Sequence, residues 1–278
     1  MTVIVMTREI GCHGSDVAAG VAAELGLEII NSEIAVSNVA GSLGVEQSTV
    51  QRYLQGSASI FERWQIDKRK LSRFTSEQIL RLAQQDNVLI RGWGANALFR
   101  DIPQVISVRI CAPMELRERL MMERLGVKHI EDVRKEILRF DAARESTMRA
   151  SFNIHDSDSL LYHIVLNTGL VPIPACVGAI CHLAKDPLFT DSVATRSAIA
   201  DKLLEKTVRA ILVESVGVEM GSITISAVNG RIIFDGVTTS GTLRARAEKL
   251  ARGIEGVHDI DNRINSVPKV SVRFGGDG

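Results

Sequence analysis

The sequence lacks net charge, because its 33 basic and 33 acidic residues cancel. A chain without a net positive field has no long-range attraction to polyanions, so we expect no nucleic-acid partner. The sequence also lacks an apolar run of the roughly 20 residues that a bilayer-spanning helix needs. We therefore expect no transmembrane segment.

Cysteine is scarce, with 4 residues in a chain of 278. This number is too low for a disulfide framework in a chain of this length. Cys176 and Cys181 are expected to be buried thiols, because their spacing does not match common zinc sites. The first five residues show no basic segment leading into an apolar stretch, as a secretory signal would. Together these absences favour a cytoplasmic protein.

A glycine-containing turn near the amino terminus lacks the lysine that is typical of phosphate-binding loops. An apolar, β-branched run ends at Thr7, and the turn and helix start that follow are Gly11-Cys12-His13-Gly14-Ser15-Asp16. A strand, a glycine turn and a helix amino terminus aim backbone N–H groups at one point, which suits a phosphate. The strict pattern has Gly-Lys-Ser/Thr where this chain has Gly14-Ser15-Asp16. An anion site and an ordinary strand-to-helix connection are both compatible with these residues.

Short β-branched runs alternate with helical patterns over residues 1–185, which is typical of an α/β fold with a parallel sheet. The expected strands are Val3–Met6, Glu28–Ile30, Val88–Arg91, Val105–Ile110 and Tyr162–Asn167. Their continuous apolar character predicts helices on both faces of the sheet. A mostly helical insertion is expected over 31–85, including a helix at 75–85, and further helices are expected at 114–125 and 132–148.

The pattern changes after Lys185. Residues 186–191 are expected to form a linker, because Pro187 disfavours helix continuation. A separate domain is expected over 192–268, followed by a tail at 269–278. Its predicted elements are a helix at 198–212, strands at 223–228 and 231–237 joined by Asn229-Gly230, a helix at 242–254 and a strand at 257–267. Gly256 is expected to end the second of these helices in a left-handed conformation.

Seven arginines gather in the segment 114–149, where the sequence predicts two helices. They are Arg117, Arg119, Arg124, Arg134, Arg139, Arg144 and Arg149. A solvated helical face with charge pairs four residues apart is one explanation. Glu115 and Arg119 fit it as an attractive pair, whereas Asp141 and Glu145 repel. Surface pairing therefore explains only part of the cluster.

The glycine turn and three later segments resemble the cytidylate kinase-like family of P-loop proteins. The turn is similar to the family's Ser-Arg-x-x-Gly-Ser-Gly-Gly-Arg-Glu pattern, and residues 87–96 are similar to Val-Ile-x-Gly-Arg-Gly-Ala-Asn. Residues 109–113 and 166–169 extend the resemblance over most of 1–185. It implies a P-loop kinase-like parallel sheet with helices on both faces. It also implies a phosphate- or nucleotide-binding site made of Arg8, Gly11, Cys12, His13, Gly14, Ser15, Asp16, Arg91, Gly92 and Trp93.

The sequence departs from the family pattern at the places where phosphate is held. Ser15 and Trp93 each stand where the family has arginine, and Cys12 and His13 add bulk between the loop glycines. Phosphoryl transfer depends on positioning and on neutralising spread negative charge, so lost cations weigh against catalysis. We therefore expect a regulatory protein that binds a nucleotide or related phosphate ligand. The alternative is an active ATP-dependent cytidylate kinase.

Each of the two alternatives has its own ligand and site residues. An active kinase would transfer the γ-phosphoryl group of ATP to a nucleoside monophosphate such as CMP, with Mg²⁺. The resemblance then implies Arg124, Asp141 and Arg144 as catalytic residues of a mobile lid, and Ser15 as the metal ligand. Without catalysis, the ligand is an unknown nucleotide.

The carboxyl-terminal region resembles a BON domain. The matching stretches are Val228–Val237, similar to the family's Val-x-Asn-Gly-x-Val-x-Leu-x-Gly pattern, and Gly253–Ile264, similar to its closing strand. The resemblance implies a small, noncatalytic α+β module that contacts a protein or small ligand. It also makes a homo-oligomer one possible form of the protein.

Overall fold

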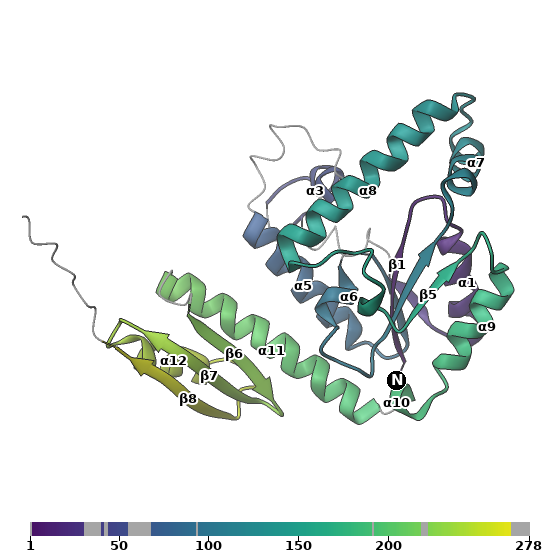
Figure 1. Cartoon of the computed structure of the whole chain (residues 1–278). Coiled ribbons are helices and arrows are strands. Elements are labelled where there is room, and N and C mark those ends of the chain that lie inside the picture. Colours follow the sequence, from purple (N-terminus) through teal and green to yellow (C-terminus); the bar gives the residue numbers. More distant parts are fainter. Residues whose placement is uncertain are drawn as a thin grey trace, which may run out of the picture. The chain divides into compact units, whose positions relative to one another are not determined.

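A computed structural model of the chain describes residues 2–30, 40–41, 44–54, 68–92, 94–190, 192–217 and 222–267. Trp93, residues 31–39, 42–43 and 55–67 of the expected insertion, and the expected tail lie outside the described residues. The chain divides into two compact units, residues 1–196 and 197–278 (Figure 1). None of the described helices is long and apolar enough to cross a membrane.

The first unit is built on a five-stranded parallel sheet in the order β2-β3-β1-β4-β5. All five strands lie where the sequence predicts them. They are β1 (Val3–Arg8), β2 (Glu28–Ile30), β3 (Val88–Arg91), β4 (Ile106–Cys111) and β5 (Ile164–Asn167). The central strand β1 and its neighbour β4 are almost entirely buried, as expected of strands covered on both faces.

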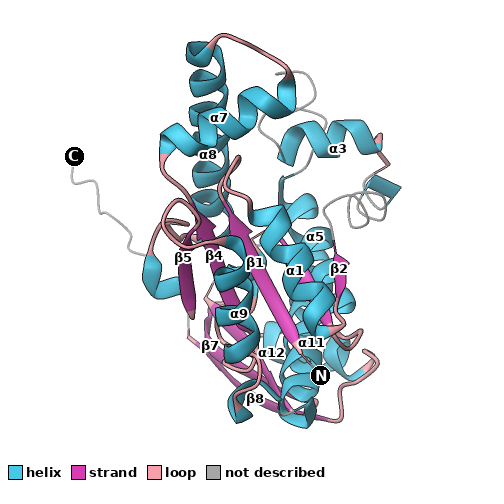
Figure 2. Ribbon diagram, turned by 90° about the vertical axis from the view of Figure 1, so that its right-hand side faces the viewer, coloured by secondary structure: helices cyan, strands magenta, loops and turns pink. Residues whose placement is uncertain are grey.

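The helices of the first unit cover both faces of this sheet. They are α1 (Gly14–Leu25), α3 (Gln47–Leu54), α5 (Lys68–Ala83), α6 (Ala95–Leu98), α7 (Met114–Leu125), α8 (Ile130–Phe152), α9 (Ile173–Leu183) and α10 (Pro187–Thr190). Helices α1 and α9 lie together over one face (Figure 2), where Ile4 and Met6 pack with Val17, Val21 and Ile180. Cys176 and Cys181 belong to the same core and are buried, as predicted.

In the first unit, helices α5, α8 and α10 differ from the sequence-based expectations. Helix α5 begins at Lys68, earlier than the expected 75. Helix α8 is longer than predicted at both ends. The short helix α10 lies inside the expected linker and begins at Pro187, because proline is tolerated in the first turn of a helix, where its missing N–H is not needed. Helix α9 ends at Leu183 and does not continue through Pro187, but the short helix that starts at this proline was not expected.

The second unit is a three-stranded sheet packed against helices. Its elements are β6 (Ile223–Val228), β7 (Arg231–Thr238), α12 (Leu243–Arg252) and β8 (Asp259–Ser266). The long helix α11 (Ser192–Val216) begins in the first unit, and most of its residues belong to the second. The order is β6-β7-β8, with β6 antiparallel and β8 parallel to β7. Phe234 and Ile232 are fully buried against Val208 and Leu212 of α11 and Ala247 of α12.

Two glycines shape the turns of this unit. Asn229 and Gly230 both have positive φ, at 49° and 75°, as the predicted two-residue hairpin requires. Helix α12 ends at Arg252 and is followed by Gly253 with a right-handed φ of −84°. Gly256 has a φ of 90° but lies beyond the helix end. Its expected role as the left-handed helix terminator is therefore wrong.

Candidate phosphate-binding site

The turn between β1 and α1 has the backbone geometry of an anion-binding loop. Gly11 and His13 are both left-handed, with φ of 73° and 56°, and α1 begins at Gly14. These residues bring the amino end of a 12-residue helix to the carboxyl edge of the sheet, beside the end of β1. Unpaired N–H groups and the positive end of the helix dipole attract an anion at such a point.

Gly11 is also where the loop touches the helices that follow β4. A Cβ atom at Gly11 would lie 2.7 Å from the carbonyl oxygen of Arg117 and 3.0 Å from Cγ of Met121. Ile10 packs in the same region against Met121, Val133 and Ile137. The α7–α8 pair therefore rests directly on the loop, beyond the end of β1 (Figure 1).

The Arg8 side chain packs against the start of α1. A Cβ atom at Gly14 would lie 2.8 Å from both Cβ and Cδ of Arg8, so the Arg8 side chain crosses the first turn of the helix. Burial and the neighbouring Arg91 lower the pKa of Arg8, and Arg124 and Arg144 act in the same direction. Arg8, Arg91, Arg124 and Arg144, which come from β1, β3, α7 and α8, therefore lie close enough to interact electrostatically.

Arg91 connects β3 to the helix start. Its Nη1 donates a hydrogen bond of 3.2 Å to Oγ of Ser15, and Gly92, with φ of 80°, turns the chain directly after β3. Ser15, expected to stand in the place of an arginine of the family, is thus a neutral acceptor, and Arg91 supplies a cation next to it. Trp93, which carries the second expected departure, lies outside the described residues.

Cys12 lies underneath the loop. Its side chain is 1% exposed, and Sγ donates to the carbonyl oxygen of Ile110 at 3.4 Å. The expected crowding of the phosphate side by Cys12 is therefore wrong. Burial raises the pKa of the Cys12 thiol, although the Gly14 N–H beside it acts in the opposite direction. This environment disfavours a reactive thiolate.

His13 and Asp16 form a pair on the outer side of the helix start. Nδ1 of His13 lies 2.7 Å from Oδ2 of Asp16, and the two side chains are 30% and 59% exposed. The pair keeps the Asp16 carboxylate at the first turn, where the helix dipole favours a negative charge. The same carboxylate opposes a phosphate bound directly beside it.

The residues expected to form a lid are held by hydrogen bonds. Nη2 of Arg117 donates to both oxygens of Asp141, at 2.9 and 2.8 Å, and its Nε donates to the carbonyl oxygen of Ile10 at 2.8 Å. Arg144 donates to the carbonyl oxygen of Arg8 and to Asp156. Arg124, by contrast, is exposed. The sequence did not identify Arg117 as a residue that contacts the loop.

Asp156 is a second residue that sequence reasoning missed. This carboxylate is 5% exposed. It accepts hydrogen bonds from Arg144, from Nη1 of Arg109 at 3.0 Å and from the Tyr162 hydroxyl at 2.8 Å. Arg109 also bonds Glu9 at 2.9 Å, next to the loop. No periodic pattern marks Asp156, because it lies in the irregular segment between α8 and β5.

The sheet order, the glycine loop and the arginines around it define a P-loop kinase-like protein. The chain belongs to the cytidylate kinase-like family, whose pattern matches residues 3–170. Residues 200–268 match the BON domain. The resemblance to both families is thus confirmed, as is the expected α/β fold with its small α+β module.

Solved structures match about two thirds of the chain at low sequence identity. An uncharacterized protein from Eubacterium ventriosum is 18% identical, with a TM-score of 0.52, and the match covers 66% of this chain and 97% of that one. Shikimate kinase from Bacteroides thetaiotaomicron is 13% identical, with a TM-score of 0.42, covering 67% and 100%. Deoxyadenosine kinase from M. mycoides is 10% identical, with a TM-score of 0.41, covering 67% and 100%. No curated protein sequence matches the chain.

Proposed function

We propose that the first unit binds a nucleotide or related phosphate ligand at the Gly11–Ser15 loop and acts in regulation. The observation that carries the proposal is the left-handed glycine turn at the amino end of α1, where Arg91 bonds Ser15 and Arg144 bonds the Arg8 carbonyl. Like charges gathered at a helix amino terminus repel one another, and an anionic ligand relieves that repulsion. Several cations at one point suit adjacent phosphates, and arginine binds phosphate in a planar, two-pronged geometry.

The lid contacts support a binding role over efficient catalysis. A lid arginine contributes to phosphoryl transfer by placing its guanidinium on the transferred group. In this protein Arg144 is engaged by the Arg8 carbonyl and by Asp156, and Asp141 is held by Arg117. These bonds must break before Arg144 or Asp141 acts on a substrate.

A second candidate function is an active cytidylate kinase. It is favoured by the position of Arg144 directly at the loop, since a rearranged lid brings the same group onto a donor phosphate. We propose that the Mg²⁺ bound to ATP contacts the exposed Asp16 carboxylate. One carboxylate together with phosphate oxygens and waters is an ordinary Mg²⁺ ligand set. Ser15 fits the metal poorly, because its oxygen accepts a hydrogen bond from the Arg91 cation.

Isothermal titration of the whole chain with ATP, CMP and inorganic tripolyphosphate tests the binding proposal. We expect binding of ATP or tripolyphosphate that weakens with added salt. We expect Arg8→Gln to reduce the affinity about tenfold, as the loss of a charged hydrogen bond does. Arg139→Gln is the matched control, because Arg139 lies on α8, pairs with Glu136 and is 46% exposed. Absence of binding by all three ligands contradicts the proposal.

A coupled phosphoryl-transfer assay with ATP and CMP separates the two functions. Tight binding without turnover supports the regulatory role. Turnover of CMP that disappears in Arg144→Ala supports the kinase instead. Either result leaves the binding proposal intact, because it is tested by titration alone.

We propose that the BON domain serves as the sensing or assembly module of a cytoplasmic protein, with a protein or small ligand as its partner. Sedimentation of the whole chain with and without ATP tests the assembly role. A change in association state on nucleotide binding supports coupling between nucleotide binding and assembly. A single sedimenting species of monomer mass under all conditions contradicts a homo-oligomer.

A further inference from the structure

The side chain of Arg117 contacts both the phosphate-binding loop and helix α8. Its Nε donates to the carbonyl oxygen of Ile10 at 2.8 Å, and its Nη2 donates to both oxygens of Asp141, at 2.9 and 2.8 Å. Ile10 directly precedes Gly11, the first left-handed residue of the loop, and Asp141 lies in the middle of α8. One guanidinium group therefore joins the loop to the helix.

This contact is more enclosed than an ordinary surface ion pair. The Arg117 side chain is 5% exposed and that of Asp141 is 36% exposed. Nη1 of Arg117 also lies 3.7 Å from Oε2 of Glu9, and the same oxygen accepts the backbone N–H of Ala112 at 3.1 Å. A planar guanidinium with several donors holds several acceptors in one fixed geometry, which the single ammonium of lysine does not. Arg117 therefore has the surroundings of a residue that fixes the position of its partners.

Helix α8 has a second attachment to the loop, about one turn further along. Arg144 donates to the carbonyl oxygen of Arg8 and to Asp156. Residues three apart lie on the same face of a helix, so Asp141 and Arg144 face the loop together. This face of α8 thus holds the Arg8 carbonyl directly and the next carbonyl but one, that of Ile10, through Arg117.

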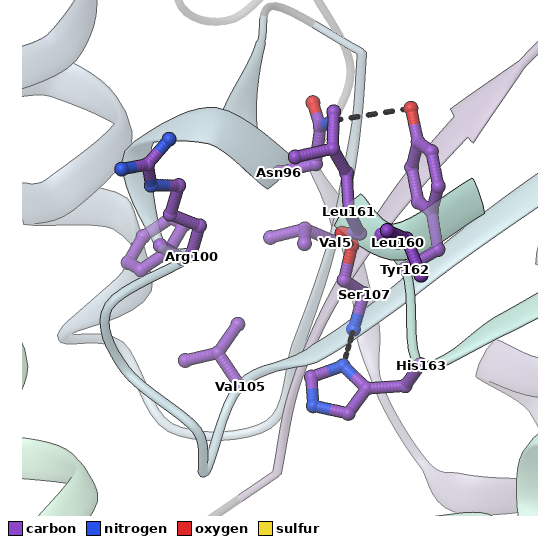
Figure 3. Close-up of a pocket in the computed structure, with 10 residues that line it drawn as sticks. Val5, Asn96, Arg100, Val105, Ser107, Leu160, Leu161, Tyr162 and His163 are labelled. Carbon is purple, nitrogen blue, oxygen red and sulfur yellow. Dashed lines mark hydrogen bonds between the residues drawn. The ribbon is translucent and has the colours of Figure 1, made fainter. Parts of the chain in front are cut away.

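Asp156, which accepts from Arg144, is fixed by a further chain of hydrogen bonds. Its Oδ1 accepts from the Tyr162 hydroxyl at 2.8 Å, and that hydroxyl accepts from Nδ2 of Asn96 at 3.1 Å (Figure 3). Asn96 belongs to α6 and is buried. The anion that holds Arg144 is therefore fixed by residues of other elements.

The segment that follows α8 is also bonded to the sheet. Nδ1 of His163 accepts the backbone N–H of Ser107 in β4 at 3.0 Å (Figure 3). Both residues line a pocket of about 370 Å³ next to the short turn η1 (Ser159–Leu161). Helix α8 is therefore held against the sheet at its Arg144 attachment, and this places Asp141 beside the loop.

We propose that Arg117 is a positioning residue that transmits the placement of α8 to the phosphate-binding loop, so that anion affinity depends on the contact between Arg117 and Asp141. The inference rests on the proposed phosphate-binding function and names a regulation of that site. The physical step is the Ile10 carbonyl. Its oxygen shares a planar peptide unit with the N–H group of Gly11, so holding the oxygen fixes the direction of an N–H group in the loop.

The coupling acts in both directions. An event that draws α8 away from the loop releases the Ile10 carbonyl and lowers the affinity for the anion. By linkage, a bound anion that fixes the loop stabilises the docked position of α8 by the same free energy. A partner that binds α8 and a ligand that binds the loop are therefore expected to influence each other.

Asp141→Ala distinguishes positioning from simple charge. If charge alone matters, removing a carboxylate near an anion site raises the affinity for anions. If Arg117 needs Asp141 to hold the loop, the affinity falls. In isothermal titration of the whole chain with ATP and inorganic tripolyphosphate, we expect about fivefold weaker binding, at the lower end of couplings between sites.

Glu136→Ala is the matched control for this substitution. Glu136 also lies on α8, its side chain is 38% exposed, and it pairs with Arg139. The control removes the same charge from the same helix at a similar exposure. We expect the affinity of this variant to equal or exceed that of the original chain.

Two further measurements test the route through Arg117. In ¹H–¹⁵N NMR of the ligand-free chain, the backbone amide of Gly11 should shift in Asp141→Ala and not in Glu136→Ala. Arg117→Lys keeps the buried positive charge but not the geometry that joins the two partners, so it should weaken ATP binding as Asp141→Ala does. In the Arg117→Lys background, Asp141→Ala should then change the affinity by no more than about twofold, because residues in one chain of contacts are not additive.

Equal or higher affinity of Asp141→Ala relative to Glu136→Ala overturns the inference and leaves the proposed function standing. An unchanged Gly11 amide shift in Asp141→Ala, or full additivity with Arg117→Lys, also overturns it. If the original chain binds neither ATP nor tripolyphosphate, the failure lies in the proposed function, and this inference falls with it.

Discussion

The guanidinium of Arg144 donates a hydrogen bond to the backbone carbonyl of Arg8. The donor comes from α8, and the acceptor is the last residue of the central strand. The other terminal nitrogen of Arg144 bonds Asp156, which also accepts from Arg109 of β4. The position of α8 and the geometry of the loop therefore depend on the same buried carboxylate.

Replacing that carboxylate should weaken both the fold and the site. We expect Asp156→Asn to lower the free energy of unfolding by about 3 kcal/mol, because it leaves Arg109 and Arg144 without their buried anion. We also expect weaker ATP binding, because Arg144 no longer anchors α8 to β1. Urea denaturation and isothermal titration measure the two effects.

Asp158→Asn is the matched control for this substitution. Asp158 is exposed and caps the η1 turn through the Leu160 N–H at 3.0 Å, a bond that asparagine also makes. We expect stability and affinity close to those of the original chain. Equal effects of the two substitutions would show that Asp156 has no special part in holding the loop.

The loop geometry predicts a difference between two glycines with similar φ. Gly11 (73°) and Gly26 (65°) are both left-handed, so alanine costs roughly 1 kcal/mol at either position through the backbone alone. A Cβ at Gly11 also meets the Arg117 carbonyl at 2.7 Å, whereas nothing lies within 4 Å of one at Gly26. Gly11→Ala should therefore cost at least about 1 kcal/mol more than Gly26→Ala and should alone reduce ATP affinity. Chemical denaturation measures the difference, and equal costs would contradict the contact between α7 and the loop.

Burial of His163 predicts a loss of stability in mild acid. Burial lowers its pKa from the usual 6.5, so below that pH the unfolded chain binds a proton that the folded chain resists. The stabilising contribution is fully present above pH 6.5 and is lost as the pH falls through the folded-state pKa. His163→Asn keeps an acceptor for the Ser107 N–H and removes the titration. Urea denaturation from pH 7.5 to 5 should give a shallower pH dependence for the variant, and parallel curves would contradict the prediction.

The elements that depend on local sequence were predictable. β1, β3 and β4 are short, continuous apolar runs, and Asn229-Gly230 specifies its hairpin turn through residues that tolerate positive φ. The limits of α8 were missed by a few residues at each end, although Ile130, Val133 and Ile137 continue the helical apolar spacing at its start. Helix α10 was missed because Pro187 was taken only as a residue that disfavours helix continuation, whereas it also fits the first turn of a new helix.

The position of the glycine loop was predictable, but the contacts around it were not. The glycines and the nearby arginines identify the loop, since they follow β1 and β3 directly. Cys12 was misjudged because its direction depends on the left-handed residues on either side of it. Glu9, Arg109 and Asp156 are brought together only by the register of the sheet and the path of the chain between α8 and β5, which no local pattern encodes.

Asp201 in the second unit provides a local test of the BON hairpin. Its two carboxylate oxygens accept the backbone N–H groups of Asn229 and Gly230, at 2.7 and 2.9 Å. We expect Asp201→Ala to cost about 2 kcal/mol of local stability, because two charge-assisted hydrogen bonds are lost. Asp201→Asn, which retains one acceptor, should cost less. Hydrogen exchange at the Asn229 and Gly230 amides measures the effect directly, and unchanged exchange in Asp201→Ala would show that the turn holds itself through its own φ preferences.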